Sequence, residues 1–231
     1  MVSPLDTRSK LFLTLTSVFV TALVVGDLIG GKLMGVTFFG QVHFLSVGFI
    51  PFPVTFLLTD LLNEFYGKSA ARTVTWVGFG MAVFTLVTLT VAGAMPWHPE
   101  TLKPGWTGLT PSTFDAVFAS GRRILIASMT AYVVAQLIDI AIFDQLKKLT
   151  RGRLLWVRAT GSTIISQLID TIVIQSLVWS GNLDLPKLTD LVITSWAGKI
   201  IIAVLLTPLI YAAHAVVQRL LKISPLAPGE G

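Results

Sequence analysis

The chain has 231 residues, of which 53% are hydrophobic and only 13% are charged, and its mean hydropathy is +0.78. Soluble domains carry about 25% charged residues, so the composition excludes an ordinary soluble globule and indicates a protein with several membrane-spanning helices. The net charge of +5 does not require nucleic acid as a partner, because the lysines and arginines lie between hydrophobic segments, where membrane topology explains them.

Six apolar segments joined by short loops predict an all-α, polytopic membrane protein: a six-helix transmembrane bundle in one domain, residues 1–231. The expected spans are about residues 11–28, 45–65, 73–95, 120–144, 159–180 and 191–217. Residues 73–95 carry no charge and are long enough to cross a bilayer alone. Arg8 and Lys10 precede the first segment as in a signal peptide, but no small-residue cleavage site follows, so we expect an uncleaved first span.

Six spans would place both termini on one side of the membrane, and the basic residues indicate which side. With cytoplasmic termini, most of the 17 lysines and arginines fall in inside segments, Lys147 and Arg158 among them, as the positive-inside rule requires. The pair Arg122 and Arg123 fits this orientation poorly, and Lys199 lies within the last span. We therefore expect both termini to be cytoplasmic.

The second apolar segment ends in a polar cluster. Asp60 and Glu64 are four residues apart and share one helix face, with Asn63 beside them. A charged side chain at a helix centre costs roughly 2.5–3.5 kcal/mol to insert, so such residues are functional candidates. Pro51 and Pro53 are expected to break this helix just ahead of the cluster, as in the discontinuous helices of many transporter sites.

A short Gln-Leu-Ile-Asp motif occurs twice and places further polar groups inside the expected spans. Gln136 and Asp139 lie in the fourth span, and Gln167 and Asp170 lie in the fifth. The two spans are expected to be antiparallel, so the motif is compatible with an inverted repeat of the transporter kind, although four matching residues also arise by chance. Lys199 is the expected partner for one of the carboxylates.

The repeated amide–carboxylate pairs predict the kind of ligand that would bind between them. A carboxylate only accepts hydrogen bonds, whereas an amide donates and accepts them. The combination suits the edge of a guanine-like base, and on these grounds alone it suits purines, pteridines or flavins equally. Phe52 and Trp196, together with Phe56 and Trp179, are within reach to stack on a planar base.

The same side chains also have structural interpretations, which the sequence leaves open. Intramembrane polar residues link neighbouring helices, at about 0.6 kcal/mol per hydrogen bond on average. Asp60 and Glu64 can instead cap the cytoplasmic end of the second span, close to water and to Lys68 and Arg72. Asp27, at the end of the first segment, is expected at the membrane interface rather than inside the bundle.

Three longer motifs resemble those of a known family: Phe-Pro-x-Thr-Phe-x-Leu-Thr-Asp-Leu-Leu-Asn-Glu-x-Tyr-Gly-Lys over residues 52–68, Ala-Gln-Leu-Ile-Asp over 135–139, and Gly-Ser-Thr-Ile-Ile-Ser-Gln-Leu-Ile-Asp over 161–170. Gly-Gly-Lys over 30–32, Lys199, and Thr-Pro-x-x-Tyr over 207–211 extend the likeness. The chain resembles the queuosine-precursor transporter family, also called the vitamin-uptake-transporter-like (VUT) family, over nearly its whole length.

The resemblance implies a bacterial inner-membrane importer of 7-deazaguanine queuosine precursors (preQ0, preQ1 or queuine), with a bundle similar to the substrate-binding subunits of vitamin importers. It implies a small-molecule substrate and the lipid bilayer as partners, and no nucleic acid, cofactor, metal or catalytic residue. It also assigns a substrate-site role to Asp60, Asn63, Glu64, Gln136, Asp139, Gln167, Asp170 and Lys199.

Competing functions stay open at this point. The chain could transport alone, or it could be the substrate-binding subunit for a vitamin or purine that depends on a separate ATPase module, which we do not favour. An intramembrane enzyme is disfavoured, because cysteine is absent and no motif contains a His–Asp pair. Gly26 and Gly30 give the first span a small-residue face that is compatible with a homodimer, a docking surface or internal packing.

Overall fold

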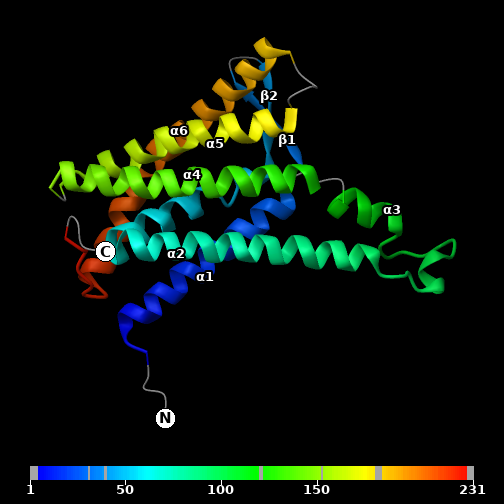
Figure 1. Cartoon of the computed structure of the whole chain (residues 1–231), viewed down its shortest axis with the longest axis horizontal. Helices are drawn as coiled ribbons and strands as arrows, with labels where there is room; N and C mark the ends of the chain where they lie inside the picture. Colours follow the sequence, from blue (N-terminus) through cyan, green and yellow to red (C-terminus); the bar gives the residue numbers. More distant parts are fainter. Residues whose placement is uncertain are drawn as a thin grey trace.

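The computed structural model describes residues 5–30, 32–38, 41–119, 122–151, 153–179 and 184–227. The described chain is mostly helical, as expected (Figure 1). Its long helices are α1 (Thr7–Ile29), α2 (Phe52–Ala94), α4 (Arg122–Leu149), α5 (Leu155–Trp179) and α6 (Leu185–Arg219). The short helix α3 (Pro111–Phe114) continues into a π-helical turn (Asp115–Ala119), and 3-10 turns occupy Val47–Phe49 and Pro99–Leu102.

An antiparallel hairpin, formed by β1 (Leu33–Phe38) and β2 (Gln41–Ser46), is the departure from the all-α expectation. Its register runs from Leu33 opposite Ser46 to Phe38 opposite Gln41. Val and Phe occur in both strands and Thr37 lies in β1, and such β-branched and aromatic residues favour paired strands. The hairpin occupies the segment in which we expected a loop followed by the start of the second helix.

The second helix therefore begins at Phe52 rather than near residue 45, and the two prolines start it instead of breaking it. Pro51 is the N-cap residue and Pro53 lies in the first turn. Proline suits this place, because the first N–H groups of a helix have no intrahelical partner and the proline ring fixes a helical φ.

Gly67 divides α2 into two arms, residues 52–66 and 68–94. Its φ of 81° and ψ of 176° are not helical, and this conformation is essentially restricted to glycine. An unbroken helix over all 43 residues would be about 65 Å long, roughly twice the hydrocarbon thickness of a bilayer. The break is thus where the chain can separate the second and third expected spans.

Three groups from distant parts of the chain satisfy backbone carbonyls at the Gly67 break. Arg8 donates to the carbonyl of Phe65 (2.6 Å), and the Lys147 ammonium donates to that of Glu64 (3.0 Å). The Leu226 N–H also donates to the Glu64 carbonyl (3.1 Å). The start of α1 and the end of the described chain therefore meet at the same end of the bundle, a place that also suits cations at a helix C-terminus.

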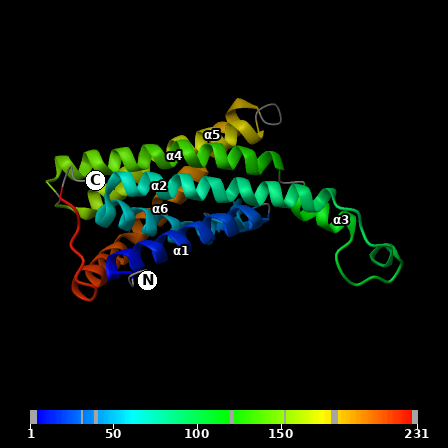
Figure 2. The ribbon, with the colours of Figure 1, turned by 60° about the horizontal axis from the view of Figure 1, so that its bottom comes forward.

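The helices pack as a bundle with polar side chains inside and large apolar side chains outside. Close contacts join α1 to α2, α2 to α4 and α6, and α5 to α4 and α6; Figure 2 shows α1, α2 and α4 side by side. Ser162, Ser166 and Thr171 of α5 are buried, whereas Phe84 and Leu205 are 64% and 72% exposed. Water would not favour this arrangement, but a lipid environment does.

Four helical segments of the described chain are long and apolar enough to cross a membrane: Thr7–Ile29, Val47–Ala94, Ile126–Leu149 and Leu185–Arg219. The first of these is capped by Asp6, whose carboxylate accepts the Ser9 N–H at 2.9 Å. Gly26 faces the chain itself, since a Cβ there would lie 3.1 Å from Pro51. The six-span topology and the cytoplasmic termini stay predictions.

Candidate functional site

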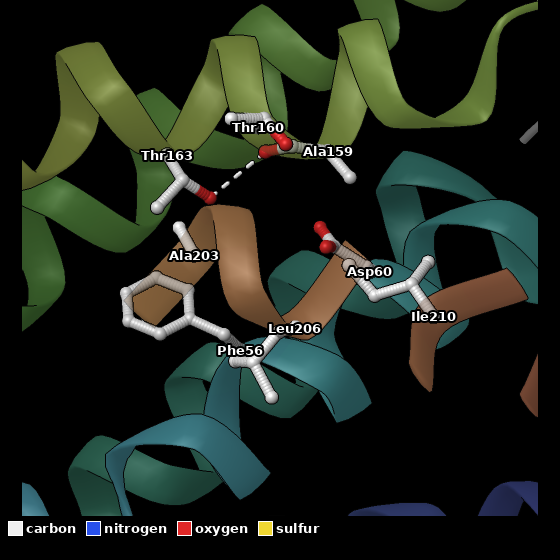
Figure 3. A pocket seen from close by; sticks show the side chains of 8 residues that line it. All are labelled: Phe56, Asp60, Ala159, Thr160, Thr163, Ala203, Leu206 and Ile210. Carbon is white, nitrogen blue, oxygen red and sulfur yellow. Dashed lines mark hydrogen bonds between the residues drawn. The ribbon is translucent and has the colours of Figure 1, made fainter. Parts of the chain in front are cut away.

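A small pocket lies where the first arm of α2 meets α5 and α6, and Asp60 projects into it (Figure 3). Asp60 is only 3% exposed, and its Oδ1 has no hydrogen-bond partner among the described residues. The cavity volume is about 10 Å³, close to the minimum that one water molecule needs. The residues that line the pocket are Phe56, Asp60, Ala159, Thr160, Thr163, Ala203, Leu206 and Ile210.

A second buried carboxyl group, that of Asp139 on α4, is close to Asp60. The two side chains interact electrostatically, and Asp139 is 2% exposed. The Ser166 hydroxyl of α5 donates to Asp139 Oδ1 at 3.0 Å, while Asp139 Oδ2 has no partner within the described part of the chain. The first arm of α2 thus contributes one acid and α4 contributes the other, with α5 holding the second in place.

Amide groups predicted from the sequence lie near these acids. Gln136 donates to the Thr59 hydroxyl at 3.1 Å, which links α4 to α2. Gln167 Oε1 and Asn63 Nδ2 are buried without hydrogen-bond partners in the described ranges. Because the large majority of buried side-chain polar atoms in proteins are paired, these unpaired donors and acceptors make the region a candidate binding site.

Glu64 belongs to a different group, an ion cluster at the Gly67 end of the bundle. Arg158 Nη2 lies 2.6 Å from Glu64 Oε1, and the Lys147 ammonium lies 3.2 Å from Oε2. His214 Nε2 is 3.5 Å from Oε1, and the Phe143 ring lies 5.8 Å from the Arg158 guanidinium. One carboxylate therefore contacts side chains of α4, α5 and α6 from its place on α2. Glu64 and Arg158 are themselves buried, with 3% and 1% of their surface exposed.

The sequence analysis missed the roles of Arg158 and Lys147. It counted them among the basic residues on the cytoplasmic side, which set the orientation of the protein in the membrane. No sequence signal separates a basic residue that turns inward at a helix end from one that faces water. The pairing of a buried glutamate with buried cations could have been anticipated only from the cost of leaving Glu64 unpaired.

A third group lies on the other side of the Asp60–Asp139 pair along α5. Lys199 pairs with Asp170 at 2.5 Å, as expected, and its ammonium lies 5.4 Å from the centre of the Phe52 ring. Phe49 stacks on Phe52 with ring centres 4.9 Å apart. The indole N–H of Trp196 donates to a backbone carbonyl of α5 at 2.9 Å. These contacts fix α6 against α5 and against the start of α2.

Asp27, which the sequence analysis expected at the membrane interface, contacts neighbouring helices. It is partly buried, it accepts a hydrogen bond from the Ser128 hydroxyl of α4 (3.2 Å), and it interacts electrostatically with Asp170. The ten predicted site residues thus form three groups rather than one: a central group of Asp60, Asn63, Gln136, Asp139 and Gln167, an ion cluster that holds Glu64, and a third group with Asp170, Lys199, Phe52 and Trp196.

Residues 46–213 match the protein family described as "Putative vitamin uptake transporter", and this range contains all ten predicted site residues. The chain belongs to that family. The protein is thus a transporter rather than an enzyme, and its apolar helices fit a multi-pass membrane protein. In the described residues, no group of three or more His, Asp or Glu side chains is arranged to hold a metal ion.

Three relatives of this transporter carry related names. It is 27% identical over 175 residues to the "Probable queuosine precursor transporter" of Bacillus subtilis, covering 74% of this chain and 72% of the relative. The Haemophilus influenzae protein of the same name is 33% identical over 138 residues, which cover 59% of this chain and 53% of the relative. The "Queuosine precursor transporter" of Escherichia coli is 27% identical over 125 residues (54% and 51%). No solved structure gives a significant match to this transporter.

Proposed function

We propose that this transporter imports 7-deazaguanine queuosine precursors, namely preQ0, preQ1 or queuine, across the bacterial inner membrane. The observation that carries the proposal is the set of unpaired, buried carboxyl and amide groups beside the Asp60 pocket. The names of the relatives support the choice of ligand. The bilayer and the deazapurine are then its partners.

The central group provides the complement of a guanine-like edge. Asp60 and Asp139 provide acceptors for ring N–H and exocyclic amine donors, and the amides of Asn63, Gln136 and Gln167 can bond the carbonyl and the remaining ring atoms. The unpaired atoms of this group make hydrogen bonds when the base binds. Binding therefore removes the free-energy cost of leaving these atoms unpaired, and no existing hydrogen bond of theirs has to break.

The other predicted site residues act at the two ends of this central group. Glu64 is held by two cations, so it serves the base less well than Asp60 does, and it closes the bundle at the Gly67 end. The Phe52 ring already contacts Phe49, Phe56 and Lys199. A base can stack on Phe52 only if one of these side chains moves, and the Lys199–Asp170 pair therefore closes the opposite end.

The pocket is far smaller than a ligand site, since binding cavities for small molecules usually exceed about 300 Å³. To admit a base, the first arm of α2 therefore has to move away from α5 and α6. In this arrangement the six spans are α1, the two arms of α2, α4, α5 and α6, with both termini in the cytoplasm.

Ligand-dependent thermal stabilisation of the purified protein tests the proposal. We expect preQ0, preQ1 or queuine to raise the unfolding temperature, and guanine, thiamine and riboflavin to raise it less. Asp60→Asn and Asp139→Asn should abolish the shift, whereas Asp190→Asn, a change on the exposed start of α6, should preserve it. Equal affinity of wild type and both central variants would refute the site.

Transport in vesicles that contain only this protein separates the proposal from an ATPase-dependent subunit. A transporter that acts alone exchanges internal for external labelled preQ0 without ATP. If binding is intact but exchange needs a second protein and ATP, the chain is the substrate-binding subunit of a larger importer.

A further inference from the structure

Two acids in the middle of the bundle are part of no ion pair among the described residues. The ion pairs of the described residues assign Arg158 and Lys147 to Glu64, and Lys199 to Asp170, and none of them includes Asp60 or Asp139. Asp60 and Asp139 are nevertheless 3% and 2% exposed, each with an unpaired oxygen.

Two ionised carboxylates that share a buried site repel each other strongly, because the surroundings have a low dielectric constant. Such a pair titrates as a unit, and two neighbouring carboxyl groups can hold one proton between them. The charged groups that face the pair are Glu64 on α2 and Arg158 on α5, while Lys147 on α4 and His214 on α6 contact Glu64. Arg158 and Lys147 carry two positive charges against the one negative charge of Glu64, so at most one positive charge is left for the two acids. One proton then balances the remaining negative charge.

A singly protonated pair matches the ligand of the proposed function. The Watson–Crick edge of a deazaguanine presents two neighbouring donors, its exocyclic amine and ring N–H, followed by a carbonyl acceptor. An ionised carboxylate accepts from both donors, and a protonated carboxyl donates to the carbonyl. With two carboxylates the carbonyl meets a repulsive oxygen, and with two protonated acids the ring donors meet weaker acceptors.

We infer that Asp60 and Asp139 together carry one proton that enters the cell with each substrate molecule, which makes this protein a proton–substrate symporter. The inference rests on the proposed function. The proton is taken up from the outer side when the base binds and is released to cytoplasmic water after the base leaves. No covalent bond changes, and one positive charge crosses with a neutral base.

Proteoliposomes that contain only the purified protein test the coupling, with preQ0 as the uncharged substrate and the membrane potential clamped at zero. With the outside one pH unit more acidic, we expect labelled preQ0 to accumulate inside up to about tenfold, the limit for one proton per molecule. Without the gradient, it should only equilibrate. A pH-sensitive dye should report acidification of the interior when preQ0 is added to wild-type vesicles.

Asp60→Asn and Asp139→Asn should fail to accumulate preQ0 above the outside concentration, and the matched control Asp190→Asn should accumulate it as the wild type does. Because the wild-type measurements stand alone, a variant that does not fold leaves the test intact. Rapid exchange of preQ0 by the wild type with neither accumulation nor internal acidification would overturn the inference and leave the proposed function standing. A wild type that neither binds nor exchanges any 7-deazaguanine would overturn both.

Discussion

Replacement of Glu64 by glutamine should destabilise the protein more than any other single change in its ion cluster. The substitution removes one carboxylate and leaves two nearly buried cations, Arg158 and Lys147, without a counter-charge. Removal of one partner from a buried pair typically costs about 3–5 kcal/mol. At roughly 2–4 °C per kcal/mol for a chain of this size, the unfolding temperature should fall by about 6–20 °C.

Arg158→Met should cost less, because Glu64 then retains Lys147. The double variant should cost less than the sum of the two single changes, since the charges removed belong to one network. Thermal unfolding in detergent measures all three, and Lys187→Met is the control, because its pair with Asp184 is 3.4 Å long and lies at the surface, where ion pairs contribute little. If Glu64→Gln unfolds within 2 °C of that control, the cluster does not hold the helices together.

Three further changes have definite expected outcomes. Gly67→Ala should cost about 1–3 kcal/mol, because its backbone conformation is essentially restricted to glycine, whereas Gly80→Ala, where a Cβ meets nothing within 4 Å, should not destabilise; chemical denaturation compares them. Lys199→Met should lower the unfolding temperature by leaving Asp170 unpaired, and Lys199→Arg should recover most of the loss. Trp196→Phe should cost about 1 kcal/mol through its lost hydrogen bond, measured by the same unfolding curves.

The sequence predicted the polar interior well, and the reason is energetic. Carboxylates and amides in apolar segments are costly in a membrane, so Asp60, Asp139 and Gln167 stand out from their surroundings without any structure. Lys199 could be matched to a carboxylate for the same reason, and Asp170 is its partner. What spacing along the chain does not reveal is which of these residues lie at the same depth, since this depends on how the helices are staggered.

Other features were predicted poorly because the same sequence pattern is compatible with two different structures. Arg158 and Lys147 lie at helix ends, where basic residues usually face cytoplasmic water, so their inward direction depends on Glu64. Pro51 and Pro53 are equally compatible with a break and with a beginning. The β1–β2 hairpin, in turn, is stabilised mainly by pairing between its own strands, which an apolar segment search does not detect.

The junction at Gly67 also affects how the protein can be handled. The backbone N–H of Leu226 donates a hydrogen bond to the backbone carbonyl of Glu64, and Ile223 is part of the apolar core that α1, α2 and α6 share. The last described residues therefore pack against the end of the bundle and cover it. A chain shortened to Arg219 would expose the Glu64 ion cluster to water. An affinity tag should be separated from residue 227 by a linker, so that these C-terminal contacts are kept.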